Sequence, residues 1–316
     1  SSKDNMKVES VLDLIGNTPM VGIHSMSPNR NVKIYLKLEG QNPVGSSKDR
    51  VALSMVLDAE KKGLLTPGCT IVEPSSGNTG VGLALVAILK GYKLVVVCAD
   101  NVTQERKDLL KSFGATIEFS PGNLGSNGAI AKAKELAEQN PEWVMLYQYG
   151  NEANPSTHVN ATAPEILADC PEIDVFIAGL GTSGTLMGCS RYFKKHKPEV
   201  KIVAVEPPAG EAVSGLRSLE DGFVPEIFHA DLIDRKFMIR NDESIEITRR
   251  LLSECGIFVG VSTGAIVAGA IKQARSMEAG TIVAISPDSG WKYLSAGIWA
   301  NKIEDVIEES QSTNFW

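Results

Sequence analysis

The chain has 316 residues, of which 43% are hydrophobic and 22% are charged, and its formal net charge is −7 at pH 7. A chain of this length exceeds the size at which a single hydrophobic core keeps growing, so we expect two closely associated subdomains. The acidic charge balance excludes the basic surface with which a protein binds nucleic acid or an anionic membrane.

Short segments rich in β-branched residues alternate with segments of helical length along the whole chain. Several of the short segments are apolar throughout, which is typical of parallel strands that are covered on both faces. We therefore predict an α/β fold in which helices flank mostly parallel sheets. The predicted strands are residues 32–38, 70–72, 94–98, 116–119, 175–178, 202–205 and 282–285. The least regular segment is 210–240, where we expect the substrate to enter, because long irregular segments of compact domains usually serve function.

The five cysteines lie far apart and form no C-x-x-C pair, which argues against a zinc site and against a disulfide framework. We expect buried thiols in a reducing compartment, and therefore a cytoplasmic protein that binds no metal. The longest apolar stretches, such as residues 81–89, are too short to cross a bilayer.

Residues 42–50, with the sequence Asn-Pro-Val-Gly-Ser-Ser-Lys-Asp-Arg, lead from a predicted loop into an apolar helical segment. This order places Lys48 near a helix N-terminus, where the helix dipole disfavours a cation and helps to keep the amine neutral. A neutral amine can form a Schiff base. A lone lysine is more often solvated than catalytic, so the interpretation of Lys48 depends on the other motifs.

Residues 73–80 (Glu-Pro-Ser-Ser-Gly-Asn-Thr-Gly) stand where a predicted strand ends and the next helix begins. Free N–H groups and hydroxyls at such a point bind carboxylates or phosphates, at the strand end where open α/β sheets hold their ligands. An ordinary helix cap uses the same residue types, so this motif alone leaves both interpretations open.

Residues 179–185 (Gly-Leu-Gly-Thr-Ser-Gly-Thr) follow another predicted strand and open another helix. The glycines and hydroxyl residues can form a nest of donors around one phosphate, although a purely structural glycine turn remains an alternative. The spacing is not that of a full G-x-G-x-x-G dinucleotide site, so a single phosphate fits better. We expect residues 260–265 to form a third strand-to-helix loop, in which Ser262 taken alone would be a helix cap.

In this order, the four motifs resemble those of the fold-type II pyridoxal-phosphate enzymes, specifically the cysteine synthases. The similarity extends from about residue 11 to residue 297, and residues 15–20 (Ile-Gly-Asn-Thr-Pro-Met) are similar to the family's opening signature. The resemblance implies pyridoxal 5′-phosphate as the cofactor. It also implies the tryptophan synthase β-like fold, with two subdomains that each contain a central, mostly parallel sheet flanked by helices.

The resemblance implies roles for individual residues. Lys48 would bind the cofactor covalently and act as the catalytic base, and Ser262 would face the pyridine nitrogen, where a neutral serine favours elimination over transamination. The other cofactor contacts would come from Asn78, at the 3′ oxygen, and from Gly181, Thr182, Ser183, Gly184 and Thr185, around the phosphate. The substrate α-carboxylate would bind Ser75, Ser76, Asn78, Thr79 and Gln148, where Ser75 replaces the threonine more usual in the family.

The implied reaction is a β-replacement, in which an activated serine loses its leaving group, an α-aminoacrylate forms and sulfide adds to the β-carbon. Residues 215–225 lack the His-Lys-Ile-Gln-Gly pattern of ordinary O-acetylserine enzymes and resemble the branch that uses O-phosphoserine. Residues 143–151 and 290–295 also resemble that branch. Its arginine matching Arg217 recognises the substrate phosphate, and a guanidinium fork suits a phosphate well. A solvated surface arginine is the alternative.

The resemblance further implies the domain organisation and the partners. Residues 46–150 would form a smaller, movable subdomain with the carboxylate-binding loop, and residues 7–45 with 151–306 a larger subdomain that binds the cofactor phosphate. Residues 307–316 would form a C-terminal tail that acts as a flap over the active site, and a dimer contact or a disordered end is the alternative for this tail. The sulfur donor would be sulfide or a small carrier protein that ends in a thiocarboxylated glycine, and we expect a homodimer.

Three alternatives remain open. The chain would be an O-acetylserine sulfhydrylase of ordinary specificity if Arg217 did not bind the substrate. Cystathionine β-synthase shares the core motifs and carries out a related β-replacement, whereas serine and threonine dehydratases differ in their lysine and phosphate motifs. The alternative that is not an enzyme is a catalytically silent scaffold that binds a peptide, against which the intact Lys48 argues.

Overall fold

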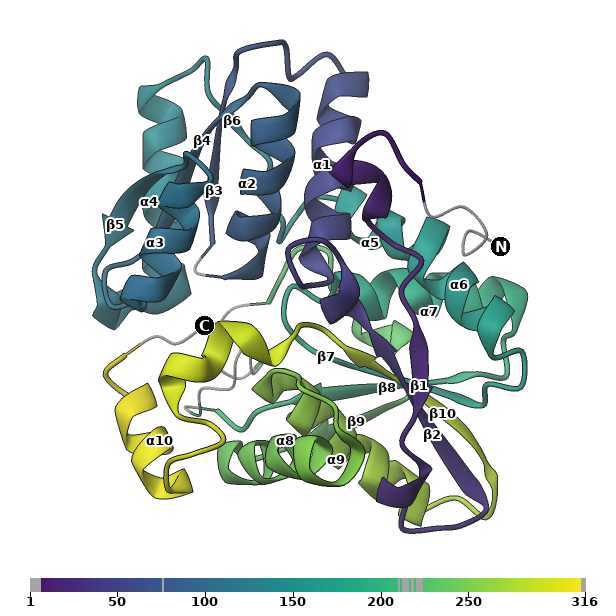
Figure 1. Cartoon of the computed structure of the whole chain (residues 1–316). Helices are drawn as coiled ribbons and strands as arrows, with labels where there is room; N and C mark the ends of the chain where they lie inside the picture. The colour runs from purple at the N-terminus through teal and green to yellow at the C-terminus, as the bar shows by residue number, and fades with distance from the viewer. Residues whose placement is uncertain are drawn as a thin grey trace.

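The computed structural model describes residues 7–75, 77–209, 211, 216, 219 and 224–313, and these residues form two sheets with helices packed against them (Figure 1). The six-stranded sheet has the order β1-β2-β10-β7-β8-β9, and β1 is its antiparallel member. The four-stranded sheet has the order β5-β4-β3-β6 and is parallel throughout. The α/β class predicted from the sequence is confirmed.

The elements have the following bounds. The strands are β1 (Met20–Gly22), β2 (Val32–Leu38), β3 (Thr70–Pro74), β4 (Lys93–Ala99), β5 (Thr116–Ser120), β6 (Val144–Met145), β7 (Val175–Gly179), β8 (Lys201–Glu206), β9 (Arg235–Met238) and β10 (Gly280–Ser286). The helices are α1 (Lys48–Lys61), α2 (Asn78–Lys90), α3 (Gln104–Ser112), α4 (Gly125–Gln139), α5 (Ala153–Thr157), α6 (Ala163–Asp169), α7 (Gly184–His196), α8 (Asn241–Cys255), α9 (Val261–Arg275) and α10 (Ile303–Ser310).

The seven strands predicted by residue range are all present, but β1, β6 and β9 were not predicted. β6 has only two residues, which is too short for a periodic signal. β9 lies within the segment 210–240 that was expected to be irregular, and that expectation is wrong for its four residues. The strand pairs with β8 at the edge of the sheet, and its charged Arg235 and Lys236 are tolerated there because an edge strand faces solvent.

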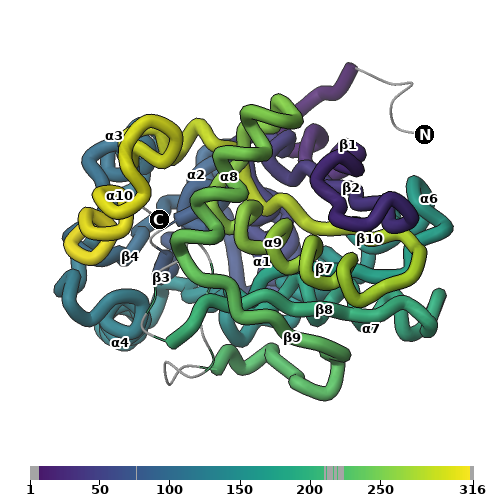
Figure 2. The backbone as a smooth tube through the Cα atoms, turned by 90° about the horizontal axis from the view of Figure 1, so that it is seen from below, coloured from purple at the N-terminus to yellow at the C-terminus, as the bar shows by residue number. Residues whose placement is uncertain are grey.

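The core around the larger sheet follows from the alternation of side chains along its central strands. On β7, Val175 and Ile177 pack into the cluster that includes α8 and α9, whereas Phe176 and Ala178 pack into the cluster that includes α6 and α7. α8 and α9 lie side by side (Figure 2). Both faces of β7 are therefore buried, which explains why this strand is apolar throughout.

A glycine allows α2 to lie directly against the start of α1. A Cβ atom at Gly82 would stand 2.9 Å from the carbonyl oxygen of Lys48, which is closer than side-chain carbons approach in proteins. The close approach of these two helices sets the position of Lys48 relative to α2.

A buried ion network ties the same end of α1 to the larger sheet. The guanidinium of Arg50 donates two hydrogen bonds of 2.8 Å to the carboxylate of Glu165 on α6, and it also binds Glu39. Lys37 on β2 stands 2.9 Å from the same Glu165 carboxylate and is fully buried. Burial alone would raise the pKa of Glu165, but the hydrogen bonds and charges of Arg50 and Lys37 outweigh it and lower that pKa to about 2.

All five cysteines are free thiols. Cys98, Cys170 and Cys189 are buried as expected, whereas Cys69 and Cys255 are partly exposed. Among the helices of the described residues, we find none with the length and apolar character needed to span a membrane.

Candidate active site

All the residues predicted to bind the cofactor line one cavity between the two sheets. Lys48 comes from α1 and Asn78 from α2, while Ser262 comes from α9. The loop between β7 and α7 adds Gly181, Thr182, Ser183, Gly184 and Thr185. Residues separated by more than a hundred positions in the sequence are thus brought together at the carboxyl ends of the strands, where open α/β sheets bind their ligands.

Lys48 is the first residue of α1, as the sequence predicted. Its backbone N–H donates to the hydroxyl of Ser46 at 3.0 Å, and its ammonium donates to the hydroxyl of Thr182 at 3.4 Å. Burial disfavours the charged form and lowers the pKa of Lys48 from its usual 10.5 to about 8. The amine therefore reaches its neutral, nucleophilic form near physiological pH.

This pKa predicts how cofactor loading depends on pH. When pyridoxal phosphate is added to cofactor-free protein, the loading rate should rise with pH through about 8, where half of Lys48 is neutral, and level off about one unit above it. A lysine with the usual pKa would give a rate that still increases near pH 10. Stopped-flow absorbance of the cofactor across this pH range measures the difference.

The loop before α7 has the features of a phosphate site. Ser183 adopts a left-handed backbone conformation with φ of 73°, which turns the chain into the helix. The Ser183 hydroxyl is buried and has no hydrogen-bond partner among the described residues. α7 has 13 residues, and the free N–H groups at its N-terminus carry partial positive charge toward the cavity.

Two residues outside this loop contact the hydroxyls of Thr182 and Thr185. Asn154 on α5 donates to the Thr182 hydroxyl at 2.9 Å, and a Cβ atom at Gly184 would stand 2.0 Å from its side-chain oxygen. His158 is fully buried, and one ring nitrogen stands 3.4 Å from the hydroxyl of Thr185. Burial, together with the charges of Arg50 and Lys48, lowers the pKa of His158 well below its usual value, so the ring is neutral at physiological pH.

These residues fit pyridoxal phosphate. The cavity contains an amine for the aldehyde, a nest of N–H and hydroxyl donors for the phosphate, and the neutral Ser262 hydroxyl for the pyridine nitrogen. The unpartnered Ser183 hydroxyl is the kind of buried donor that a ligand oxygen would satisfy.

The surroundings of Ser262 differ from the sequence expectation. No strand precedes α9: Val259 forms only an isolated bridge with Ser289, and α8 ends at Cys255. Ser262 is the second residue of α9, and its helix starts after a turn between two helices rather than after a strand. A short apolar run before a glycine cannot be distinguished from a strand by its pattern alone.

Three of the residues predicted to bind the substrate carboxylate, Ser75, Thr79 and Gln148, stand beside the cavity and make hydrogen bonds there. They do not line the cavity, whereas Asn78 does. The hydroxyl of Thr79 donates to the side chain of Gln148 at 2.6 Å, and the hydroxyl of Ser75 accepts from the N–H of Gly80 at 2.9 Å. Ser76 and Arg217 lie outside the described residues.

Glu73 holds the backbone next to this group by hydrogen bonds. Its buried carboxylate accepts hydrogen bonds from the backbone N–H groups of Tyr147 at 2.7 Å and Gln148 at 2.9 Å. Burial outweighs these bonds and raises the pKa of Glu73 to about 7. Tyr147 has a φ of 60°, so the carboxylate holds a strained turn that places Gln148 beside Thr79.

Several residues at the site were not found from the sequence. Leu216 and Asp288 line the cavity, and Asn154 and His158 support its phosphate loop. Asp288 could have been noticed, because it follows a predicted strand at the sheet edge where ligands bind. Asn154 and His158 carry no such signal, since they lie in a segment without a motif.

The chain matches the family model described as "Pyridoxal-phosphate dependent enzyme" over residues 11–288. A cysteine synthase of Staphylococcus aureus is 41% identical over 303 residues, which cover 93% of this chain and 97% of that protein. Among solved structures, an O-ureido-L-serine synthase has a TM-score of 0.88 and 42% identity, covering 93% of this chain and 95% of the other. The cysteine synthase (OASS) of Entamoeba histolytica has a TM-score of 0.89 and 31% identity, with coverage of 98% and 97%.

Proposed function

Because this chain belongs to the cysteine synthase family of pyridoxal-phosphate-dependent enzymes, we propose that it makes cysteine by replacing the β-substituent of an activated serine with sulfur. Its cofactor is pyridoxal phosphate. The observation that carries the proposal is the single cavity in which Lys48, Asn78, the phosphate loop and Ser262 meet.

When bound, pyridoxal phosphate supplies an electron sink that makes the proton on the substrate Cα acidic. Lys48 would hold the cofactor and would take the Cα proton of the substrate on its amine. The bond between the β-carbon and the leaving oxygen breaks and its electron pair leaves with the oxygen, the sulfur nucleophile forms its bond to the same carbon, and Lys48 returns a proton to Cα. Closure of the smaller subdomain over the site would exclude water during these steps.

The substrate α-carboxylate would bind Ser75, Ser76, Asn78, Thr79 and Gln148, and the described members of this set lie at or beside the start of α2. In support, the N-terminus of this helix carries free N–H groups and a hydroxyl-rich loop. The hydroxyls of Ser75 and Thr79 make hydrogen bonds within the protein. Carboxylate binding would therefore exchange these internal bonds for bonds to the substrate.

We propose O-phosphoserine as the substrate, with Arg217 as the residue that recognises its phosphate. Leu216, the neighbour of Arg217 in the chain, lines the cofactor cavity, and its side chain packs over Gly179. The position of Leu216 at the cavity supports a role in substrate binding for its neighbour in the chain. O-acetylserine is the second candidate, because the relatives of the chain include enzymes of that type.

Replacing Arg217 by alanine should lower kcat/KM for O-phosphoserine by about 10- to 100-fold, since a hydrogen-bonded charge pair contributes about 1.5–3 kcal/mol. The value for O-acetylserine should change little. Steady-state kinetics with both substrates measures this ratio, and Arg275→Ala is the control because Arg275 is exposed at the end of α9. Equal behaviour of the wild type and Arg217→Ala would favour ordinary O-acetylserine specificity, and no reaction with either substrate would favour a silent scaffold.

The sulfur donor is proposed to be sulfide or a thiocarboxylated carrier protein, with residues 307–316 as a flap. The predicted start of this tail falls inside α10, which continues to Ser310. The carbonyl of Ser312 accepts from the side chain of Asn101, after β4, at 3.4 Å. This contact between the C-terminal segment and the smaller sheet supports the flap.

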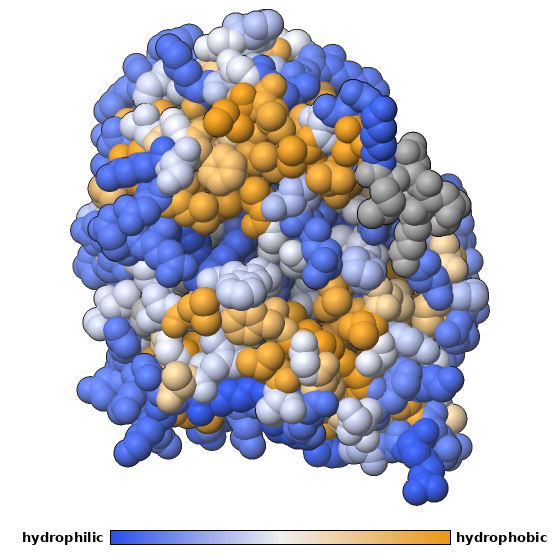
Figure 3. Space-filling model, in the orientation of Figure 1, coloured by the Kyte–Doolittle hydropathy of each residue, from blue (hydrophilic) through white to orange (hydrophobic). Residues whose placement is uncertain are grey.

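We further propose a cytoplasmic homodimer with a movable subdomain at residues 46–150 and a larger one at 7–45 with 151–306. Free thiols in all five cysteines suit a reducing compartment. Hydrophobic side chains gather on one face over α1 and α2 (Figure 3), where Leu57, Ile88 and Leu89 are exposed. An apolar face of this kind suits contact with a second copy of the chain.

A further inference from the structure

A charged pair holds the side chain of Asn78 at the wall of the cofactor cavity. The ammonium of Lys292 donates to the Asn78 side-chain oxygen at 2.6 Å, and the Asn78 side-chain nitrogen donates to the carboxylate of Asp288 at 2.9 Å. The hydroxyl of Tyr293 donates to the same carboxylate oxygen. Lys292 and Asp288 follow β10 of the larger sheet, whereas Asn78 begins a helix of the smaller unit, so the amide joins the two halves of the site.

The pair allows only one orientation of the amide. An ammonium has only hydrogen-bond donors and an ionised carboxylate has only acceptors, so Lys292 must face the amide oxygen and Asp288 the amide nitrogen. The amide nitrogen carries two hydrogens, and the bond to Asp288 uses one. The second hydrogen is available to an acceptor in the cavity that Asn78 lines.

The surroundings keep this arrangement away from water. Asp288 is buried. The glycine at position 260 leaves space for its carboxylate, because a Cβ atom at Gly260 would stand 2.2 Å from the Asp288 oxygen that does not bind Asn78. Burial lowers the pKa of Lys292 to about 8. The charges of Asp288 and Asp49 oppose this shift, whereas the charge of Arg106 adds to it. Losing one partner of such a pair leaves the other charge uncompensated.

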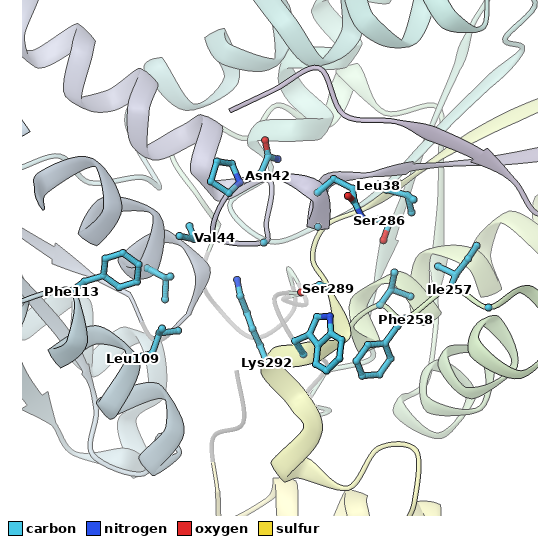
Figure 4. A pocket seen from close by; sticks show the side chains of 18 residues that line it. Leu38, Asn42, Val44, Leu109, Phe113, Ile257, Phe258, Ser286, Ser289 and Lys292 are labelled. Atoms are coloured by element: carbon cyan, nitrogen blue, oxygen red, sulfur yellow. The ribbon is translucent and has the colours of Figure 1, made fainter. Parts of the chain in front are cut away.

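Lys292 reaches Asn78 from a neighbouring cleft. The cleft has a volume of about 640 Å³ and is lined by Val44, Leu109 and Phe258, among others. In Figure 4 the side chain of Lys292 extends from the segment after β10 toward the loop with Asn42 and Val44. Lys292 does not line the cofactor cavity, and it contacts the cavity wall through its bond to Asn78.

We propose that Lys292 and Asp288 are positioning residues that hold the Asn78 amide with its N–H toward the 3′ oxygen of the bound cofactor. The inference rests on the proposed function, in which Asn78 contacts that oxygen. The reversed amide would present its own oxygen to the cofactor oxygen, and two acceptors repel. The charges on both sides also polarise the amide, which strengthens its remaining N–H as a donor.

The test is the substitution Lys292→Met, which keeps the length of the side chain and removes its charge and donors. We expect the dissociation constant of pyridoxal phosphate to rise by about 10- to 100-fold, as when a group that orients a ligand-binding residue is lost. The visible absorbance maximum of the bound cofactor should also shift. Lys292→Arg, which restores a cationic donor, should recover both properties in part, and thermal unfolding of the cofactor-free proteins controls for folding.

A double-mutant cycle separates positioning from a general structural role. In an Asn78→Ala background, Lys292→Met should change cofactor affinity by less than about 2-fold, because the amide on which it acts is gone. The same loss in both backgrounds, or an unchanged spectrum in Lys292→Met, would overturn the inference. If Lys292→Met fails to fold, Lys292→Leu also removes the charge and the donors, so it tests the same coupling in the same cycle. All these readouts are made without substrate, so they stand even if β-replacement is not the reaction.

Discussion

Replacing Lys48 by alanine is expected to lower kcat/KM by at least about 10³-fold, because the change removes both the covalent anchor of the cofactor and the catalytic base. Among the described residues that line the cavity, Lys48 is the one lysine. The kinetic loss should come with a chemical signature. Borohydride reduction of the wild type should attach the cofactor to the peptide that contains Lys48, which mass spectrometry detects.

The control is Lys61→Ala, at the exposed far end of the same helix. This variant should keep both activity and cofactor attachment. An exogenous primary amine should partly restore the rate of Lys48→Ala, because it can replace the missing base in the cavity. Full activity of Lys48→Ala, or attachment of the cofactor at another lysine, would contradict the assignment of Lys48.

The second large effect is on stability. Replacing Glu165 by glutamine should lower the free energy of unfolding by about 3–5 kcal/mol, because it leaves one buried cation without its carboxylate and a second with only Glu39. The cations are Lys37 and Arg50, both almost fully buried. Urea denaturation at pH 7 measures the loss. The control is Glu152→Gln, which breaks an exposed 3.0 Å pair with Arg191 and should cost less than about 1 kcal/mol.

The contribution of Glu165 should also depend on pH. Its pKa is about 2 in the folded protein against 4.5 for an ordinary glutamate, so the ionised form is favoured by folding. The resulting stability, about 3 kcal/mol for a shift of this size, is present above pH 4.5 and disappears as pH falls through 2. The stability difference between the wild type and Glu165→Gln should therefore shrink over this interval, and a difference independent of pH would contradict the ion network.

The sequence by itself determined the α/β class, seven of the strands and, among the residues that line the cofactor cavity, the lysine, the asparagine, the phosphate loop and Ser262, but not Leu216 or Asp288. These features are local. A buried parallel strand is apolar along its length, and a loop that binds an anion needs glycines and hydroxyls at consecutive positions, so both leave a pattern in a short window. Lys48 was identified because its motif stands in order with three others, and its lowered pKa agrees with the role.

Tertiary structure decided what these residues contact. The bonds of Asn78 to Lys292 and Asp288 join positions 214 and 210 residues apart, and no pattern in a window of the chain contains them. The same is true of Asn154 and His158 behind the phosphate loop, and of Glu165 beneath α1. The strand expected before Ser262 was wrong for a related reason, because whether a short apolar run pairs depends on which strand edge lies beside it. Local chemistry therefore specified the groups of the site, and long-range packing specified their orientation and their charge.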